Sequence, residues 1–308
     1  MSSQRQPADG ISDGLPTNKP TQQKASCTLC PRACRLAQGA RGWCGARMEH
    51  DGAVVPEHYG HISSLALDPI EKKPLAFFHP GSMILSMGGY GCNLDCPFCQ
   101  NSSIAHGWTE LSGSRETPVY HENDSALPNQ LVTYARAEVA RGNIGIAYTY
   151  NEPLIDYEFV SDCARRVHEE GLLNVIVTNG YLNEEPWLAL LPHLDAANID
   201  LKGFTQDFYD VLGAPRGLET VKRNIASAAS RIHIEVTTLI VPGLNDSLEE
   251  IGALAAWLAS VNPHIPLHLS RFFPQHRMQD RMPTPRSRLS ELAEVAREHL
   301  AHVQLGNV

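Results

Sequence analysis

The sequence predicts an α/β protein built as a partial, TIM-like (β/α)6 barrel, preceded by a small cysteine-rich region that binds metal. Three observations support this prediction. Strand-like and helix-like segments alternate from residue 84 onward. The 308 residues are 43% hydrophobic, which suffices for one large core with a small appendage. Seven of the eight cysteines fall in two tight clusters, one ahead of the alternating segments and one just after the first strand.

The alternating segments follow the periods of strands and helices. Apolar or β-branched runs predict strands at residues 84–87, 144–150, 174–177, 196–201, 232–241 and 265–269. Helical periodicity predicts helices at residues 130–141, 155–170, 185–191, 218–229 and 247–260. This order favours a parallel sheet whose faces are covered by helices. Six units are too few for an eight-stranded barrel, so we expect an open partial barrel, with a doubly wound sheet as the alternative.

The same pattern divides the chain into four predicted parts. Residues 1–26 are polar and rich in Gln, Ser and Pro, and we expect them to form a flexible tail. Residues 27–80 hold the first cysteines and a connector, and residues 81–272 form the barrel. Residues 273–308 are expected to form a loop and then a closing helix at 287–302.

Composition and charge exclude several classes of protein. No run of 18 apolar residues occurs, so no membrane span is expected, and the tail lacks the apolar core of a secretory signal. The net charge of −9 argues against nucleic-acid binding, although residues 1–50 carry a balance of +4 that could contact an acidic partner. Clustered cysteines without an export signal indicate metal ligation in a reducing compartment, so we expect a cytoplasmic protein. Cys163, in a helical segment, is expected to be a buried small hydrophobe.

Cys92, Cys96 and Cys99 lie within eight residues, directly after the first predicted strand. Three thiolates on such a loop can wrap one face of a [4Fe–4S] cluster, which usually takes four cysteines. No fourth cysteine lies nearby, so one iron would stay open to an exogenous chelator. S-adenosylmethionine (SAM) fits, because its amino and carboxylate groups chelate and one electron from the cluster cleaves its sulfonium carbon–sulfur bond. The alternative is a structural zinc site completed by a histidine such as His79 or His106.

Candidate cofactor contacts lie near the ends of later strands. They are Asn151, Glu152, Thr178, Asn179, Asp200, Lys202 and His268. A carboxylate at Glu152 is a sensible acceptor for an ammonium group, although an Asn-Glu-Pro turn also occurs as a plain cap. Asp200 and Lys202 alternate onto one strand face, where the alternative is a salt bridge that only seals the barrel. A lone histidine such as His268 is as often a satisfied core residue as a functional one.

The first cysteine cluster has the spacing Cys27-x2-Cys30-x3-Cys34-x9-Cys44. Its four thiolates are a full tetrahedral set. Zinc would make a closed structural site, and an auxiliary [4Fe–4S] cluster would be equally satisfied. The spacing does not choose between them, so the prediction is a second metal site of either kind.

The Cys-x3-Cys-x2-Cys spacing, with the aromatic Phe98 before the last cysteine, is the radical SAM signature. The chain resembles the radical SAM enzyme of the AmmeMemoRadiSam system, a branch close to pyruvate formate-lyase activating enzyme. The similar segments are residues 27–32, 68–75 (Asp-Pro-Ile-Glu-Lys-Lys-Pro-Leu), 91–101, 150–153 and 199–203. The resemblance implies the barrel, the loop cluster and SAM. It also implies a Gly-Gly-Glu-Pro-like turn that binds the methionine amino group, with Tyr150 and Asn151 here in place of the glycines.

The resemblance implies contacts from the Thr-Asn-Gly and Asp-Leu-Lys segments to the ribose and carboxylate of SAM, but it supplies no substrate. We therefore expect an enzyme whose 5′-deoxyadenosyl radical abstracts hydrogen from a protein or small molecule, and we assign no catalytic residue. A low-potential donor such as flavodoxin or ferredoxin is the expected partner, and a partner protein activated by the radical is left open. The alternatives are a non-catalytic iron–sulfur electron carrier or redox sensor, and a zinc-stabilised RNA-interacting scaffold, which the acidic remainder of the chain disfavours.

Overall fold

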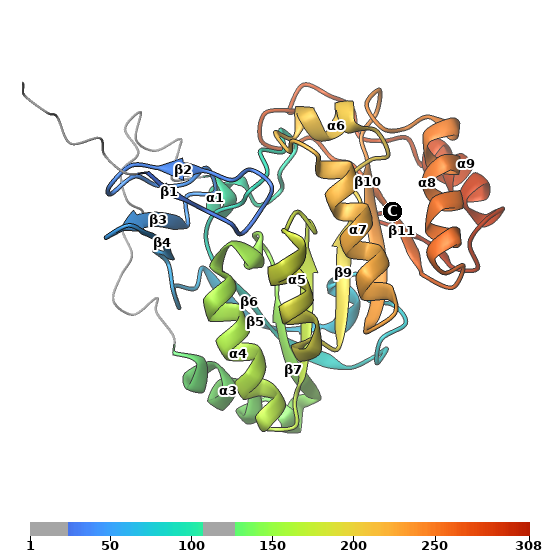
Figure 1. The fold of residues 1–308 in the computed structure, drawn as a ribbon. Helices are drawn as coiled ribbons and strands as arrows, with labels where there is room; N and C mark the ends of the chain where they lie inside the picture. Colours follow the sequence, from blue (N-terminus) through green and yellow to red (C-terminus); the bar gives the residue numbers. More distant parts are fainter. Residues whose placement is uncertain (1–23, 107–126) are drawn as a thin grey trace, which may run out of the picture.

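The computed structural model of the chain describes residues 24–106 and 127–308, and it confirms the predicted α/β fold (Figure 1). Most of the predicted N-terminal tail lies outside the described residues. The central sheet has eight strands in the order β12-β11-β10-β9-β8-β7-β6-β5. Their bounds are β5 (Ser64–Pro69), β6 (Met83–Gly88), β7 (Asn143–Tyr148), β8 (Leu173–Thr178), β9 (Ala196–Asp200), β10 (His233–Ile240), β11 (Leu267–Arg271) and β12 (Val303–Gly306).

Strands β6 to β11 are the six predicted strands, and they pair in parallel with their neighbours. Two edge strands were not predicted. β5 lies in the expected connector and pairs antiparallel with β6, while β12 pairs in parallel with β11. The prediction that the closing helix reaches residue 302 is wrong, because α9 ends at Arg297 and the chain then extends into β12. Sequential parallel pairing is what a partial barrel requires.

The helices that follow the strands occur where periodicity predicted them. Their bounds are α1 (Ser102–Ala105), α3 (Pro128–Ala137), α4 (Tyr157–Glu169), α5 (Glu184–Leu190), α6 (Gln206–Val211), α7 (Gly217–Ala229), α8 (Leu248–Val261) and α9 (Arg286–Arg297). The short helices α1 and α6 are additions to the prediction. In α8, the Ser247 side chain accepts a hydrogen bond from the Glu250 amide at 3.0 Å, a standard N-cap that starts the helix. None of the helices in the described part of the chain is long and apolar enough to cross a membrane.

The two faces of the sheet are buried in different ways. The large core packs β-strand side chains such as Leu85, Ile146 and Ile176 against the helices. On the other face, the segment of residues 70–78, which we call the floor segment, packs Ile70 and Leu75 against a second, smaller cluster. One face thus holds the helices and the other is closed at one end by a loop, the arrangement of a partial barrel rather than of a doubly wound sheet.

The floor segment is fixed to the strands by polar contacts as well. Asn198 donates to the Pro74 carbonyl at 2.9 Å. The buried carboxylate of Glu235 accepts hydrogen bonds from the backbone amides of Ala76 and Phe77, at 3.0 and 2.8 Å. These bonds satisfy buried backbone groups that a loop at this position would otherwise leave without partners.

The cysteine-rich region forms two small antiparallel pairs, β1 (Ala25–Ser26) with β2 (Arg35–Leu36) and β3 (Arg47–His50) with β4 (Ala53–Pro56). Figure 1 shows these blue strands near α1, at one end of the sheet. The first cysteine cluster therefore lies near the second, which precedes α1.

Candidate active site

The second cysteine cluster lies in the loop between β6 and α1, at the carboxyl end of β6. Gly91 in this loop has a φ of +87°, and a Cβ there would be 2.3 Å from the Cys44 carbonyl oxygen. Only glycine accepts both constraints. The loop is pinned further on by a bond from the Asp95 amide to the Leu212 carbonyl at 2.9 Å. The backbone thus fixes where the thiols lie.

The thiols of this loop lie in a largely buried, polar setting, with Cys96 buried and Cys92 and Cys99 half-buried. Cys92 Sγ accepts from the Leu94 amide at 3.4 Å and from Asn179 Nδ2 at 3.7 Å. Such N–H···S bonds tune clusters in proteins. Burial, with a smaller contribution from the Glu152 carboxylate, raises the pKa of Cys92 well above its usual value. Burial also raises the pKa of Cys96, to about 12, although nearby Lys202 opposes this shift. Iron would offset that cost by binding the thiolate forms, so the residues fit the group.

Glu152 is a buried carboxylate at the end of the next strand. Its Oε1 accepts from Thr178 Oγ1 at 2.8 Å and from the Leu154 amide at 3.0 Å, and its Oε2 accepts from the Asn179 amide at 2.7 Å. Burial raises its pKa to about 7, against the lowering effect of these bonds. The Leu154 bond makes Glu152 a cap of the 3-10 helix η4 (Pro153–Asp156), so the cap role is real. Among the described residues no ion pair joins Glu152 to a cation, which leaves a buried carboxyl group near Cys92 without a cationic partner.

Asp200 and Lys202, at the end of β9, form a salt bridge at 2.7 Å, which was the alternative to their predicted role in cofactor binding. Burial disfavours the charge of Lys202, but Asp200 and the thiols of Cys96 and Cys99 outweigh this effect and raise its pKa. The side chains are 25% and 17% exposed, so the pair seals the barrel only in part. The lysine charge is therefore available near the cysteine loop.

The structure brings most of the predicted cofactor contacts together, but the side chains of Phe98 and His268 have partners outside this group. Thr178 and Asn179 contact Glu152, as described above. Phe98 is buried and stacks on Phe208 of α6, with ring centroids 6.2 Å apart. His268 is paired across the sheet with Thr237 of β10, which is itself paired with Asp200 of β9. Its Nε2 nevertheless hydrogen-bonds Glu235 at 2.6 Å, and Glu235 also binds the floor segment.

Four residues that the sequence analysis did not select also take part: Asn93, Asn101, Asp68 and Tyr150. Asn93 accepts from Asn179 Nδ2 at 2.8 Å, and Asn101 donates to the Tyr150 carbonyl at 2.6 Å. Tyr150 OH donates to Asp68 at 2.7 Å. All four lie within the segments that are similar to the family, and this similarity was the only sequence signal that could have selected them.

The first cysteine cluster packs directly beside this loop. The Cys27 amide bonds the Cys34 carbonyl at 2.9 Å, and a Cβ on Gly42 would lie 3.9 Å from the sulfurs of both Cys34 and Cys44. Burial, with the neighbouring thiols, raises the pKa of Cys44 to about 11. Arg32 reaches from this region to the Asn93 carbonyl at 3.2 Å. The two cysteine clusters are therefore parts of one packed unit.

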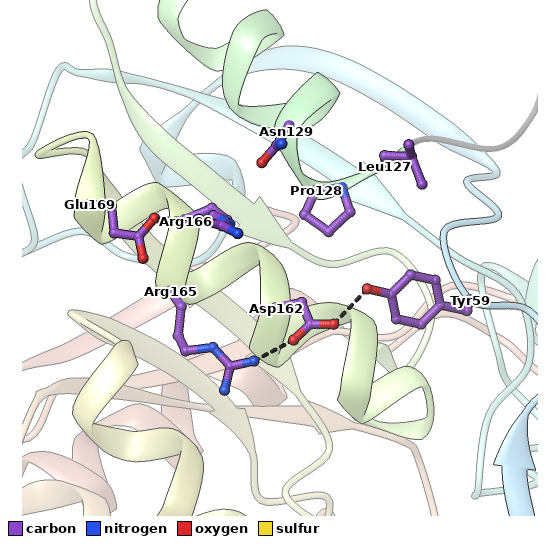
Figure 2. A pocket seen from close by; sticks show the side chains of 8 residues that line it. All are labelled: Tyr59, Leu127, Pro128, Asn129, Asp162, Arg165, Arg166 and Glu169. Carbon is purple, nitrogen blue, oxygen red and sulfur yellow. Dashed lines mark hydrogen bonds and ion pairs between the residues drawn. The ribbon is translucent and has the colours of Figure 1, made fainter.

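Two further observations bear on where ligands bind. Across residues 24–106 and 127–308, no three His, Cys, Asp or Glu side chains are arranged to hold a single metal ion. A [4Fe–4S] cluster differs from a single ion in that each thiolate bonds a different iron. Figure 2 shows a polar hollow between Tyr59, the start of α3 and α4, where Asp162 bonds Tyr59 at 2.6 Å. None of the predicted site residues lines this hollow.

A partial parallel α/β barrel with three cysteines on one loop and a buried carboxyl group at the carboxyl ends of its strands is typical of a class of cluster-dependent enzymes. The Radical SAM superfamily matches residues 87–258, and the chain belongs to this superfamily. It is accordingly an enzyme of SAM-dependent radical chemistry, and the family implies a [4Fe–4S] cluster and SAM as its cofactors.

Relatives support this assignment. An uncharacterised protein of Methanocaldococcus jannaschii is 38% identical, over 92% of this chain and 82% of that protein. The pyruvate formate-lyase-activating enzyme of Clostridium pasteurianum is 26% identical, over 54% of this chain and 65% of that enzyme. The pyruvate formate-lyase 1-activating enzyme of Escherichia coli is also 26% identical, over 51% of this chain and 60% of that enzyme. The chain thus spans less than two thirds of these activating enzymes.

Among solved structures, Streptococcus suis SuiB bound to S-adenosylmethionine superimposes with a TM-score of 0.51 at 13% identity, covering 72% of this chain and 51% of that one. This likeness concerns the fold alone. The narrower resemblance to the AmmeMemoRadiSam branch stays a prediction.

Proposed function

We propose that Cys92, Cys96 and Cys99 hold a [4Fe–4S] cluster with one open iron, to which SAM binds. When bound, these cofactors would supply one-electron cleavage of SAM to methionine and a 5′-deoxyadenosyl radical, which takes a hydrogen atom from the substrate. The observation that carries the proposal is the buried Glu152 carboxyl group, which lies near Cys92 without a cationic partner among the described residues. A non-catalytic electron carrier is not favoured, because it has no use for this carboxylate.

The other residues divide into groups that orient Glu152 and groups that carry charge. Thr178 and Asn179 donate to both carboxylate oxygens and fix their direction. Three hydrogen bonds leave acceptor capacity for one more donor, and we assign it to the SAM ammonium group. The Lys202 ammonium, paired with Asp200, is the cation that we assign to the SAM carboxylate or ribose side of the site. We assign no contact to Phe98 or His268 beyond those described.

We further propose that the radical acts on a partner protein, as an activase, or on a small molecule. Support for a protein substrate comes from the two relatives that are pyruvate formate-lyase activating enzymes. A low-potential flavodoxin or ferredoxin would supply the electron. A reducing, cytoplasmic setting suits eight cysteines that are all free thiols.

For the first cysteine cluster we propose a second metal site, either zinc or an auxiliary [4Fe–4S] cluster, on Cys27, Cys30, Cys34 and Cys44; a single zinc ion would require these side chains to rearrange from their positions in the structure. Support comes from the closeness of these thiols. Burial raises the pKa of Cys30 to about 12, the hydrogen bond from the Arg32 amide opposes this shift, and the neighbouring cysteines add to it. Thiols held together at this cost are stabilised by a bound metal.

The test is anaerobic reconstitution with iron and sulfide, followed by SAM and dithionite and an assay for 5′-deoxyadenosine. We expect product from the native chain and from Cys163→Ala, a control that removes a buried cysteine far along the sequence from both clusters. Absence of 5′-deoxyadenosine from a chain that carries a full complement of iron would refute the proposal.

A further inference from the structure

The floor segment and the Glu152 turn are connected by one side chain, that of Tyr150. Tyr150 OH donates to Asp68 Oδ2 at 2.7 Å, and Asp68 ends β5 just before the floor segment. Lys73, in the floor segment, donates to the same Asp68 oxygen at 2.9 Å. Its ammonium also lies 4.7 Å from the centre of the Tyr150 ring, within cation–π distance.

These contacts are buried and belong together. The Lys73 side chain is 3% exposed and that of Asp68 is 12% exposed. Burial favours the neutral carboxyl, but the bonds from Tyr150 and Lys73 outweigh this effect and hold the pKa of Asp68 well below its usual range. Breaking one member leaves a buried charge without its partner, which is costly. The three residues form a single unit, which we call the brace.

The backbone at Tyr150 explains why a brace is needed. Its φ is +71°, a left-handed conformation that side-chain-bearing residues rarely adopt. Such a conformation persists only where the surroundings over-determine it. The Tyr150 ring also packs where a Cβ on Gly88 would be 2.9 Å from its Cδ2 atom. A glycine at position 150 would need none of these contacts.

The strained residue lies between the cluster loop and Glu152. Its carbonyl accepts from Asn101 Nδ2 at 2.6 Å, just beyond the last loop cysteine. The neighbouring Asn151 accepts from the Gly89 amide at 2.9 Å and donates to the Gly91 carbonyl at 3.1 Å. A change in the Tyr150 backbone would therefore move the loop contacts and Glu152 together.

We propose that Asp68, Lys73 and Tyr150 act as positioning residues that hold the turn at residues 150–152 in the conformation that binds SAM. This inference rests on the proposed function for its ligand. It assigns a role to the Asp-Pro-Ile-Glu-Lys-Lys-Pro-Leu segment, whose two buried charges stabilise a tyrosine where related turns have glycine. The floor segment and the turn at residues 150–152 are then held in place by the same contacts.

The test compares Asp68→Asn, Tyr150→Phe and their combination in the anaerobically reconstituted full chain. We expect each single variant to weaken SAM binding by about tenfold, the usual effect of losing a hydrogen bond to a charged group. The combination should be no worse than Asp68→Asn alone, because Asp68→Asn already removes the charge of the acceptor that Tyr150 OH contacts. Iron content should not change, because none of the three loop cysteines is replaced.

The matched control is Lys72→Gln. Lys72 also contacts Asp68, at 3.2 Å, but its side chain is 66% exposed, so its removal should leave SAM affinity within about twofold. Equal weakening in Lys72→Gln would overturn the inference, as would unchanged SAM affinity in both Asp68→Asn and Tyr150→Phe.

A second measurement separates this inference from the proposed function. Hydrogen–deuterium exchange of the peptide covering residues 149–156, without SAM, should be about tenfold faster in Asp68→Asn than in the native chain and unchanged in Lys72→Gln. Equal exchange in all three proteins would refute the brace even if SAM is cleaved. Faster exchange in a chain that binds no SAM would support the brace and refute the proposed function.

Discussion

The two cysteine clusters lie side by side, yet their surroundings differ in kind. The four thiols of the N-terminal region lie among backbone groups and structural side chains, with Arg32 stacked 4.1 Å over Trp43. The three thiols of the β6–α1 loop lie beside Glu152, Asn179 and Lys202, which carry or orient charge. A complete set of ligands in a structural setting suits a closed metal site. An incomplete set among unpaired charge suits a site that takes a further ligand.

The comparison also separates stability from chemistry. The N-terminal region is held to the barrel by contacts such as Arg47 with Glu158, which serve folding. The loop is held by its backbone and by side-chain bonds such as that of Asn93 to the Tyr181 carbonyl at 2.8 Å. Changes in the first region should therefore affect folding more than SAM cleavage, and changes in the second should do the reverse.

The largest effect is expected from the loop. In a background where Cys27 and Cys30 are both alanine, Cys96→Ala should abolish the broad visible absorption of the reconstituted cluster and lower SAM cleavage at least about 1,000-fold, because the cluster loses a ligand. Visible spectra and 5′-deoxyadenosine measure this, with Cys163→Ala in the same background as the control. Full SAM cleavage activity without Cys96 would contradict the assignment of the SAM-cleaving cluster to this loop.

The N-terminal cluster should show the opposite behaviour. Replacing Cys27 and Cys30 by alanine should lower the free energy of unfolding by at least about 3 kcal/mol, because metal binding is coupled to folding in such regions. If the metal is zinc, SAM cleavage should survive in the protein that remains soluble. Native protein that contains neither zinc nor more iron than one cluster would contradict a second metal site.

A smaller loss of stability is expected at the contact between the N-terminal region and α4. Arg47 is 7% exposed and makes two bonds of 2.7 Å to Glu158. Arg47→Ala should lower the free energy of unfolding by about 2–4 kcal/mol, because it leaves the carbonyls of Ile155 and Val54 without this donor. The control Arg166→Ala removes a pair whose members are 55% and 60% exposed, and it should cost less than about 1 kcal/mol. Thermal unfolding of the two variants measures both losses. Equal losses would show that Arg47 contributes no more to stability than the exposed pair of Arg166.

The smallest effect concerns pH. Burial, with Glu158 nearby, raises the pKa of Asp156 from 3.8 to about 7. The folded state therefore binds this proton more tightly than the unfolded state, so the contribution of Asp156 to stability is greatest below about pH 4 and is lost as pH rises through about 7. Asp156→Asn should be more stable than the native chain by about 1–3 kcal/mol at pH 8, with the difference shrinking toward pH 6. Urea unfolding at both pH values measures it, and a gain that does not depend on pH would refute the assignment.

The sequence predicted the elements whose signals are local. The six central strands are rich in apolar and β-branched residues, and the alternation of Asp200 and Lys202 placed both on one face. β5 and β12 were missed because edge strands have mixed burial, as in β5, where only Asp68 is fully buried. The bond between Asp68 and Tyr150 could not be predicted, because it joins residues 82 positions apart across an unrecognised strand. Two of the three donors on Glu152, the Thr178 hydroxyl and the Asn179 amide, depend likewise on the placement of β8 beside β7.

The most direct test of the central claim, an open iron faced by Glu152, is a SAM titration of the reduced, reconstituted protein followed by the EPR signal of its cluster. The account predicts a saturable change in the signal of the native chain. It also predicts that Glu152→Gln, with its cluster intact, binds SAM about 10- to 100-fold more weakly, because a charge-assisted hydrogen bond of about 1.5–3 kcal/mol is lost. An EPR signal that SAM does not change, or an affinity that Glu152→Gln leaves as it was, would contradict it.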